Sequence, residues 1–337
     1  MKILSRALAL AAACISCLPA AASAAPTGGF AAPLLMTYHE SWRERPATGP
    51  AATTLAAVPG YVNVVALAFA RPDMTYRGDL DLSGTGLSYQ FSGKVLQGAI
   101  AALKRRNPKT RVLIAVGALD AGRWKGLNEA AIAALVRDLG ADGVDIDFEP
   151  SDPRCAAQPN GRVACASDTD WIGYVQRFRR ALPKPYLLSV DGWSVGAYGE
   201  GAFRTAQPTG SRYTGEMLGL LRSPAAGLID LVIICGYDVR AGFDPMTAVA
   251  AYRTYWKGPM VLGIEAPFKG AGGPFWTLAE TEALARRVAR DPHAGMMVYS
   301  LMEPTDDSVP AREHNGGRKL LQAACKGLGG GNCPAMP

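Results

Sequence analysis

Four acidic side chains lie within eight consecutive positions of the stretch DGVDIDFEP, residues 142–150, in a chain with only 29 acidic residues among 337. Three of them, Asp145, Asp147 and Glu149, alternate with bulky apolar residues. Successive side chains of a β-strand point to opposite faces, so this alternation predicts a strand with one apolar face and one face of carboxylates. Neighbouring carboxylates on that face would lie roughly 6 to 7 Å apart.

Carboxylates at this spacing favour acid–base chemistry. Their charges repel in a partly closed cavity, so at least one carboxyl is expected to hold a proton near neutral pH. A protonated acid beside an ionised base is the combination that glycoside hydrolysis and related reactions need.

Two other interpretations of the acidic stretch stay open. The carboxylates could be solvated loop residues or salt-bridge partners, although their strict alternation with bulky apolar residues argues against it. They could also hold a divalent cation, but the stretch lacks the glycine and the bidentate glutamate of an EF-hand loop. We therefore expect no metal.

The rest of the chain predicts the scaffold for these carboxylates. Apolar runs typical of buried parallel strands alternate with stretches of helical periodicity. The predicted strands are residues 33–38, 61–70, 111–118, 143–149, 186–193, 229–238, 260–267 and 295–302. The predicted helices include 94–106, 128–140, 169–182, 246–256 and 278–290. Eight such units predict an α/β protein, a single-domain (β/α)₈ TIM barrel over residues 25–337, rather than an open doubly wound sheet.

The functional residues of such a barrel gather where its strands end, and the acidic stretch falls on the fourth predicted strand. Written as D-x-x-D-x-D-x-E, Asp142, Asp145, Asp147 and Glu149 resemble the signature of glycoside hydrolase family 18. This is the family of chitinases and endo-β-N-acetylglucosaminidases, and its signature lies on the fourth strand of a (β/α)₈ barrel.

The first and sixth predicted strands extend the resemblance. Tyr237 and Asp238 end the sixth strand as the family's active-site tyrosine and aspartate do. Tyr38, on the first strand, takes the barrel-lining aromatic position. The resemblance thus runs across nearly all of the chain after residue 24, although its specific motifs cover a small part.

The resemblance implies a role for each of these side chains. Glu149 would protonate the glycosidic oxygen as general acid, and the substrate's own acetamido oxygen would be the nucleophile. Asp147 would accept a hydrogen bond from the acetamido N–H, and Asp145 would share a proton with Asp147. Tyr237 would donate its hydroxyl to the acetamido group, and Asp142 would be structural. The reaction would retain the anomeric configuration and need no cofactor.

Three features depart from the family pattern. The third strand usually ends S-x-G-G, whereas residues 115–118 are AVGA, so the serine hydroxyl that would support the inner aspartates is absent. The eighth strand usually offers a tryptophan under the cleaved sugar, and here Tyr299 takes that place with less apolar area. The gap between Pro267 and Gly295 has room for little more than one helix, where members with deep clefts insert a small domain. We therefore expect a shallow, open groove that cuts within sugar chains.

Other sugar-binding side chains are expected near strand ends. Trp193, just after the fifth strand, is the foremost candidate for a stacking platform. Trp42, Trp276 and Tyr198 are further candidates that could equally be core or loop anchors. Glu265, on the seventh strand, could bind a sugar hydroxyl or pair with an arginine.

The N-terminus predicts export. Residues 1–24 contain Lys2 and Arg6, then a short apolar run and a small-x-small sequence, as in a cleavable secretory signal peptide. We expect a mature chain that begins at Ala25 and is secreted to the extracellular space or the periplasm. A membrane anchor, or a lipoprotein formed through Cys14, is the alternative.

Export to an oxidising compartment favours disulfides. Two cysteine pairs close short loops rich in Pro, Gly and Asn: Cys155 with Cys165, and Cys325 with Cys333. Cys235 lies in the apolar run LVIICGY, where a buried, unpaired thiol is expected and a reactive thiol is the alternative.

Composition narrows the class of partner. The formal charge of +6 falls to +4 without the signal peptide, and the basic residues are scattered, so nucleic-acid binding is not expected. We expect a monomer that does not associate with membranes after signal cleavage. The leading hypothesis is a hydrolase of β-1,4-linked N-acetylglucosamine oligo- or polysaccharides, most simply a chitinase. The alternatives are an endo-β-N-acetylglucosaminidase acting on N-glycans and a non-catalytic, chitinase-like sugar-binding protein. Glu149 argues against the last, because non-catalytic relatives commonly lose this glutamate.

Overall fold

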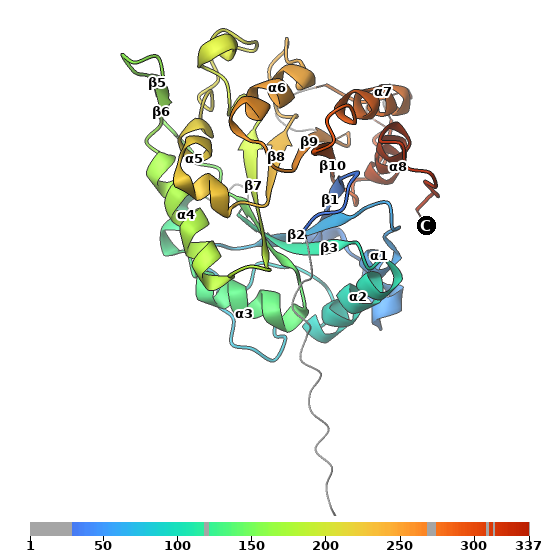
Figure 1. Ribbon diagram of the computed structural model, residues 1–337. Coiled ribbons are helices and arrows are strands. Elements are labelled where there is room, and N and C mark those ends of the chain that lie inside the picture. Colours follow the sequence, from blue (N-terminus) through green and yellow to red (C-terminus); the bar gives the residue numbers. More distant parts are fainter. Residues whose placement is uncertain (1–28, 118–120, 268–273, 308–309, 313, 337) are drawn as a thin grey trace, which may run out of the picture.

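Eight parallel strands close into a barrel that helices surround (Figure 1). The computed structural model describes residues 29–117, 121–267, 274–307, 310–312 and 314–336. The barrel strands are β1 (Leu35–Glu40), β2 (Val64–Ala70), β3 (Arg111–Gly117), β4 (Gly143–Asp147), β7 (Leu187–Trp193), β8 (Leu231–Cys235), β9 (Met260–Glu265) and β10 (Ala294–Tyr299). Each pairs with the next along the chain, and β10 pairs with β1 to close the barrel. The predicted (β/α)₈ architecture is confirmed, whereas the predicted signal peptide lies outside the described residues.

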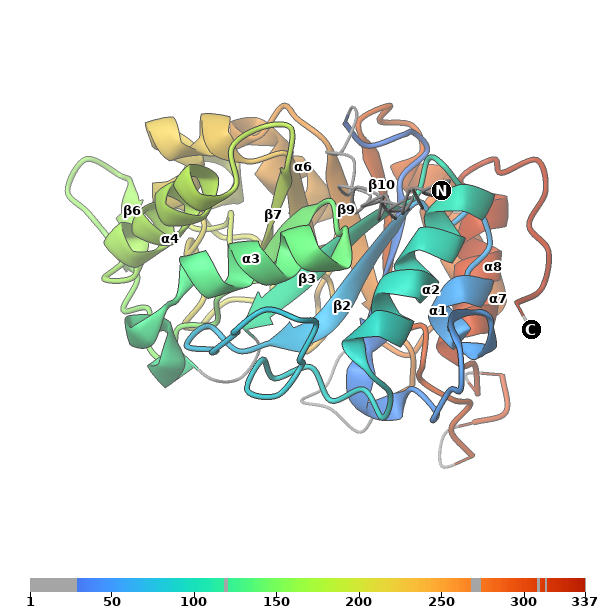
Figure 2. The same cartoon turned by 90° about the horizontal axis from the view of Figure 1, so that it is seen from below.

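Helices cover the outer side of the barrel, as Figure 2 shows for α2 and α3 against β2 and β3. They are α1 (Thr54–Ala57), α2 (Gly93–Arg106), α3 (Glu129–Leu139), α4 (Asp168–Ala181), α5 (Leu218–Arg222), α6 (Pro245–Tyr255), α7 (Leu278–Val288) and α8 (Gly317–Gly327). Side chains mark where helices begin. Ser92 accepts the Val95 N–H at the start of α2, and Thr277 forms a capping box with Glu280 at the start of α7. The five predicted helices are present, and α1, α5 and α8 were not among them.

Side chains alternate between the two faces of each barrel strand, and this divides the apolar core into two clusters. Outward-facing residues, including Val144 and Ile146 of β4, pack with the helices in the larger apolar cluster. Inward-facing residues such as Met36 and Leu113 form a smaller cluster inside the barrel. The carboxylate face of β4 therefore points into the barrel, as its alternation predicts.

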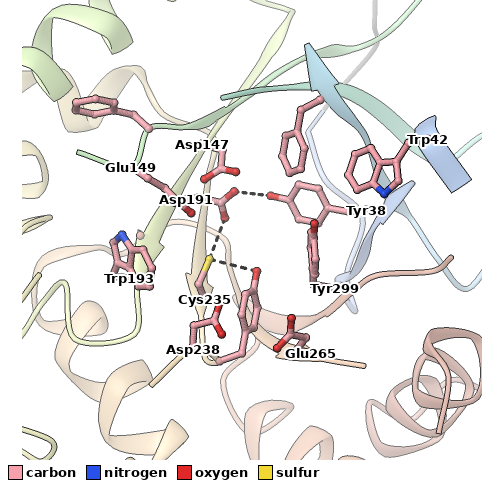
Figure 3. Close-up of a pocket in the computed structure, with 14 residues that line it drawn as sticks. Tyr38, Trp42, Asp147, Glu149, Asp191, Trp193, Cys235, Asp238, Glu265 and Tyr299 are labelled. Atoms are coloured by element: carbon pink, nitrogen blue, oxygen red, sulfur yellow. Dashed lines mark hydrogen bonds between the residues drawn. The ribbon is translucent and has the colours of Figure 1, made fainter. Parts of the chain in front are cut away.

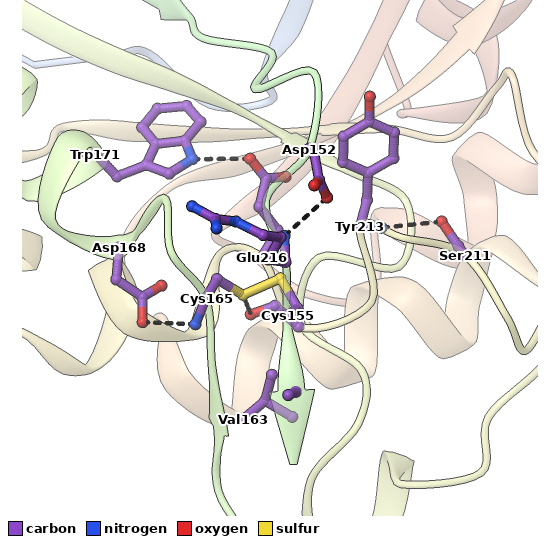
Figure 4. Close-up of a disulfide and its surroundings, with 12 residues drawn as sticks. Asp152, Cys155, Val163, Cys165, Asp168, Trp171, Ser211, Tyr213 and Glu216 are labelled. Atoms are coloured by element: carbon purple, nitrogen blue, oxygen red, sulfur yellow. Dashed lines mark hydrogen bonds between the residues drawn. A yellow bond between two sulfur atoms is a disulfide. The ribbon is translucent and has the colours of Figure 1, made fainter. Parts of the chain in front are cut away.

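Two loops are fastened by the predicted disulfides. Cys155–Cys165 has an S–S distance of 2.02 Å and flanks a short hairpin that was not predicted, β5 (Ala156–Ala157) with β6 (Val163–Ala164) (Figure 4). Cys325–Cys333 joins the end of α8 to the C-terminal tail. Cys235 is unpaired, as expected.

Between β9 and β10, the described residues contain α7 and no additional helix or strand. This agrees with the expectation that no sizeable domain is inserted there. Over the described ranges, no helix is both long enough and apolar enough to cross a bilayer.

Candidate active site

The carboxylates of β4 are graded in depth. Asp145 is fully buried within the strand, Asp147 ends it with 8% of its surface exposed, and Glu149 lies two residues further on and is half-buried. Strand β3 approaches the end of β4 closely at Gly117, which has a φ of 130°. A Cβ at this position would lie 1.9 Å from the Asp147 carbonyl oxygen, so the approach requires glycine.

A pocket of about 320 Å³ opens at the C-terminal ends of the strands (Figure 3). It contains all the predicted catalytic and substrate-binding residues except Asp145, which is not a lining residue but contacts the lining residue Tyr38. The lining residues are Tyr38, Trp42, Phe69, Asp147, Phe148, Glu149, Asp191, Gly192, Trp193, Cys235, Tyr237, Asp238, Glu265 and Tyr299. Residues far apart in the chain are thus brought to one cavity by the barrel.

Hydroxyl groups from two other strands hold Asp145. The Tyr38 hydroxyl lies 2.7 Å from Asp145 Oδ2, and Ser189 Oγ donates to Asp145 Oδ1 at 2.5 Å. The serine of the S-x-G-G pattern is absent from β3, but another serine hydroxyl takes its place beside Asp145. The hydroxyl comes from β7 instead of β3, on the opposite side of β4. Of the AVGA sequence, Ala118 lies outside the described residues.

Asp191 is a further carboxyl of the pocket that was not among the predicted site residues. It is 7% exposed, its Oδ2 contacts the Tyr38 hydroxyl, and its Oδ1 lies 3.7 Å from Cys235 Sγ (Figure 3). A signal for it was present, because Ser189, Asp191 and Trp193 alternate along β7 as the acids of β4 do. The same alternation rule places all three on one face.

The pocket's environment favours protonated carboxyls. Burial, followed by the charge of Asp238, raises the pKa of Glu149 to about 7. Burial, followed by the charges of Asp238, Glu303 and Glu40, raises the pKa of Glu265 to about 8. None of the described lining residues is a lysine or arginine that would oppose these shifts. Glu149 can therefore hold a proton near neutral pH, as a general acid must.

Glu216 is a fully buried glutamate outside the pocket lining. Trp171 Nε1 donates to Glu216 Oε1 at 2.9 Å near the Cys155–Cys165 disulfide (Figure 4). Burial raises the pKa of Glu216 to about 8 even though this bond opposes the shift.

Asp142 lies at the other end of β4, away from the pocket. Its Oδ1 is 2.8 Å from Lys104 Nζ, and its Oδ2 accepts the Val112 N–H at 2.8 Å. These contacts support the structural role that was predicted for it.

Aromatic rings stand at two parts of the pocket's edge. Trp193 stacks on Tyr213 with ring centroids 4.1 Å apart and an interplanar angle of 7°. Trp42 is 45% exposed and lies beside Phe69, with centroids 6.0 Å apart. Both tryptophans can offer a flat apolar face to a sugar ring.

Tyr299 occupies the interior of the pocket rather than its edge. Its ring lies 5.4 Å from that of Tyr38 and 5.8 Å from that of Tyr237. The other two aromatic candidates, Tyr198 and Trp276, are not lining residues, and Tyr198 is only 1% exposed. These two are anchors of the structure rather than platforms of this pocket.

No group of three or more His, Cys, Asp or Glu side chains within the described part of the chain is arranged to hold a metal ion.

The protein is thus a closed (β/α)₈ barrel with an acidic pocket at the C-terminal ends of its strands. Solved structures, two of them chitinases, share this barrel. A GH18 chitinase from Pseudoalteromonas aurantia is 17% identical over 88% of this chain and 100% of its own, with a TM-score of 0.57. A GH18 chitinase from Cycas revoluta, solved in complex with (GlcNAc)3, is 13% identical over 87% of this chain and 99% of its own, with a TM-score of 0.54. YKL-39, solved in the presence of chitooligosaccharides, is 14% identical over 88% of this chain and 99% of its own, with a TM-score of 0.58.

No protein-family sequence model and no curated protein matches the chain. The structural likeness therefore shows that the chain has the fold of GH18 chitinases, the family that its acidic stretch resembles.

Proposed function

We propose that this protein is a secreted glycoside hydrolase that cleaves β-1,4-linked N-acetylglucosamine polymers, as chitinases do. One observation carries the proposal: Glu149, with a pKa of about 7, shares a sugar-sized pocket with Asp147 and Tyr237. The neighbours solved with chitooligosaccharides support the class of sugar. The signal-like residues 1–24 support secretion.

In the proposed mechanism, Glu149 donates its proton to the glycosidic oxygen as the bond to the anomeric carbon breaks, and the bonding electrons stay with that oxygen. The substrate's acetamido oxygen attacks the anomeric carbon, so an oxazolinium ion forms and no enzyme nucleophile is needed. Water then opens this ion with Glu149 as base, which retains the anomeric configuration. Asp147 accepts the acetamido N–H and stabilises the positive charge.

The remaining lining residues position the sugar. The Tyr237 hydroxyl, 3.5 Å from Cys235 Sγ, donates to the acetamido group when substrate is bound. Trp193 and Trp42 stack on neighbouring sugar rings, while Tyr299 lies under the sugar that is cleaved. Asp238 and Glu265 bind sugar hydroxyls.

The test is hydrolysis by the purified mature chain of chitin oligosaccharides and, separately, of a high-mannose glycoprotein. We expect cleavage of the oligosaccharides, and a loss of about 10³-fold in kcat for Glu149→Gln, because the general acid is removed. Glu282→Gln, on the exposed surface of α7, is the matched control. A Glu149→Gln variant that cuts as fast as the parent would refute the mechanism.

Two other outcomes would identify the alternatives. Cleavage of the glycoprotein alone would identify an endo-β-N-acetylglucosaminidase. That function is favoured by Tyr299 in place of tryptophan and by the lack of an inserted domain among the described residues between β9 and β10. Sugar binding without cleavage would identify a chitinase-like binding protein.

A further inference from the structure

The Tyr38 hydroxyl lies between two carboxyl groups. It is 2.7 Å from Asp145 Oδ2. It is also in hydrogen-bond contact with Asp191 Oδ2, as Figure 3 shows. A phenol has one proton and donates one hydrogen bond. Burial, followed by the charges of Asp145 and Asp191, raises the pKa of Tyr38 well above its ordinary value, so the phenol keeps this proton. The second contact therefore needs another proton, which one of the two carboxyls must supply.

The two carboxyls differ in the donors around them. Asp145 accepts from the Ser189 hydroxyl on one oxygen and faces the Tyr38 hydroxyl on the other, an arrangement that favours its ionised form. Besides Tyr38, Asp191 forms a side-chain hydrogen bond with Asp145, which lowers the pKa of Asp145 and raises that of Asp191. Its Oδ1 lies 3.7 Å from the Cys235 thiol, which is a weak donor. The environment thus stabilises a negative charge on Asp145 better than on Asp191.

We propose that Asp191 is a positioning residue that holds the proton of this network, donating it to the Tyr38 oxygen while Tyr38 donates to an ionised Asp145. Both contacts then contain one proton each. The pKa of Asp191 agrees with this assignment, because burial, followed by the charges of Asp145 and Asp147, raises it well above its ordinary value.

Within the described part of the chain, no positively charged group is found to compensate a charge on Asp191. The titratable groups that face it are Tyr38 of β1, Asp145 and Asp147 of β4, Cys235 and Tyr237 at the end of β8, and Tyr252 of α6. None of these groups is a cation. Ionised Asp191 would thus add a charge to a site that already contains two aspartates.

A neutral Asp191 allows Asp147 to remain ionised, a consequence that rests on the proposed function. If the shared proton lay on Asp147, this carboxyl could not stabilise a positive oxazolinium ion until the proton moved away. With the proton on Asp191, Asp147 meets the substrate as an anion. The resemblance implied a proton shared between Asp145 and Asp147. The proposal places it instead on the β7 side of Asp145, at Asp191.

Infrared spectroscopy of the full mature chain locates the proton without relying on catalysis. At about pH 9, Glu149, Glu216 and Glu265 are largely ionised, since their pKa values are about 7, about 8 and about 8. We expect the wild-type minus Asp191→Asn spectrum to contain the carbonyl band of a protonated carboxyl, and the wild-type minus Glu282→Gln spectrum to lack it. A wild-type minus Asp191→Asn spectrum without this band, or the same band in both spectra, would overturn the proposal.

Carbon-13 NMR of the unaltered, aspartate-labelled protein gives an independent answer if a variant does not fold. One aspartate carboxyl carbon should keep the chemical shift of a protonated acid through about pH 9. Ionisation of every aspartate below about pH 7 would contradict the proposal.

Kinetics test the consequence for Asp147. Asp191→Asn keeps a neutral donor, so we expect kcat on chitin oligosaccharides within about threefold of the parent. Asp191→Ala should lose about tenfold or more in kcat with little change in KM. The acid limb of its pH profile should also move to higher pH, because Asp147 then takes up the proton. Equal losses in both variants, with unshifted pH profiles, would show that Asp191 only fills space. If the parent does not cut, the proposed function fails, while the spectra still locate the proton.

Discussion

The two ends of the barrel surround their buried and partly buried carboxyl groups in opposite ways. At the N-terminal end, Asp142 and Asp230 each precede a strand and pair with a cation: Lys104 Nζ at 2.8 Å and Arg179 Nη2 at 2.6 Å. Each also accepts a backbone N–H from a neighbouring strand. At the C-terminal end, the described lining of the pocket includes five carboxyl side chains and neither lysine nor arginine.

Carboxyl groups therefore stabilise the fold at one end of the barrel and supply protons at the other. A cation and a backbone donor keep a buried carboxylate ionised. If either the cation or the carboxylate is removed, the charge that remains is left without a partner. Without a cation, burial raises the pKa of a carboxyl and makes its proton available near neutral pH. Strand β4 connects the two ends, because Asp142 precedes its first residue and Asp147 ends it.

The largest effect that this comparison predicts is on catalysis at the pocket end of β4. Asp147→Asn removes the anion that stabilises the oxazolinium ion, so we expect kcat to fall by about 10² to 10³-fold. The thermal unfolding midpoint should not fall, because the variant removes a buried charge. Initial rates on chitin oligosaccharides and a thermal melt are the measurements. A variant that keeps more than about a tenth of the parent's kcat would remove Asp147 from the mechanism.

At the other end of the strand, the same substitution should act on stability instead. Asp142→Asn leaves Lys104 without its carboxylate partner, and we expect the free energy of unfolding to fall by about 2 to 3 kcal/mol, since Lys104 is partly exposed. Urea denaturation measures this loss, and the kcat of the folded variant should stay within about twofold of the parent. A large loss of kcat at unchanged stability would show that Asp142 acts in catalysis rather than in stabilising the fold. Lys104→Met combined with Asp142→Asn should recover part of the lost stability.

The barrel and the carboxylate face of β4 could be predicted from sequence because both depend on local periodicity. Alternation over five to seven residues defines a strand face, and it placed Asp145 and Asp147 correctly inside the barrel. The β5–β6 hairpin was missed for the same reason, since two residues in each strand are too few to show a period.

The hydrogen-bond partners of the carboxylates on β4 could not be predicted in the same way. Ser189 lies opposite Asp145 because of the register between β4 and β7, across 44 positions of the chain. Ala115 lies opposite Asp145 on the other side, so the residue that lacks a hydroxyl and the residue that supplies one flank the same carboxyl. Proton affinities depend further on burial in the assembled pocket, which no single strand determines.

The smallest effect that we predict is a shift in the pH profile at the pocket end. Glu149 must be protonated to act as an acid, so kcat/KM should fall about tenfold for each pH unit above its pKa of about 7. Burial is the larger cause of this raised pKa, and the charge of Asp238 is the smaller one. Asp238→Asn removes only the charge, so the alkaline limb should move to lower pH by less than about one unit.

Glu303→Gln is the matched control for this shift. Glu303 is another carboxyl near the pocket, but its charge raises the pKa of Glu265, whereas the pKa of Glu149 is raised by burial and by Asp238. Profiles of kcat/KM between about pH 5 and pH 9 should therefore show the alkaline limb displaced in Asp238→Asn and unchanged in Glu303→Gln. A limb that moves to higher pH in Asp238→Asn, or equally in both variants, would mean that Glu149 is not the acid whose ionisation limits the rate.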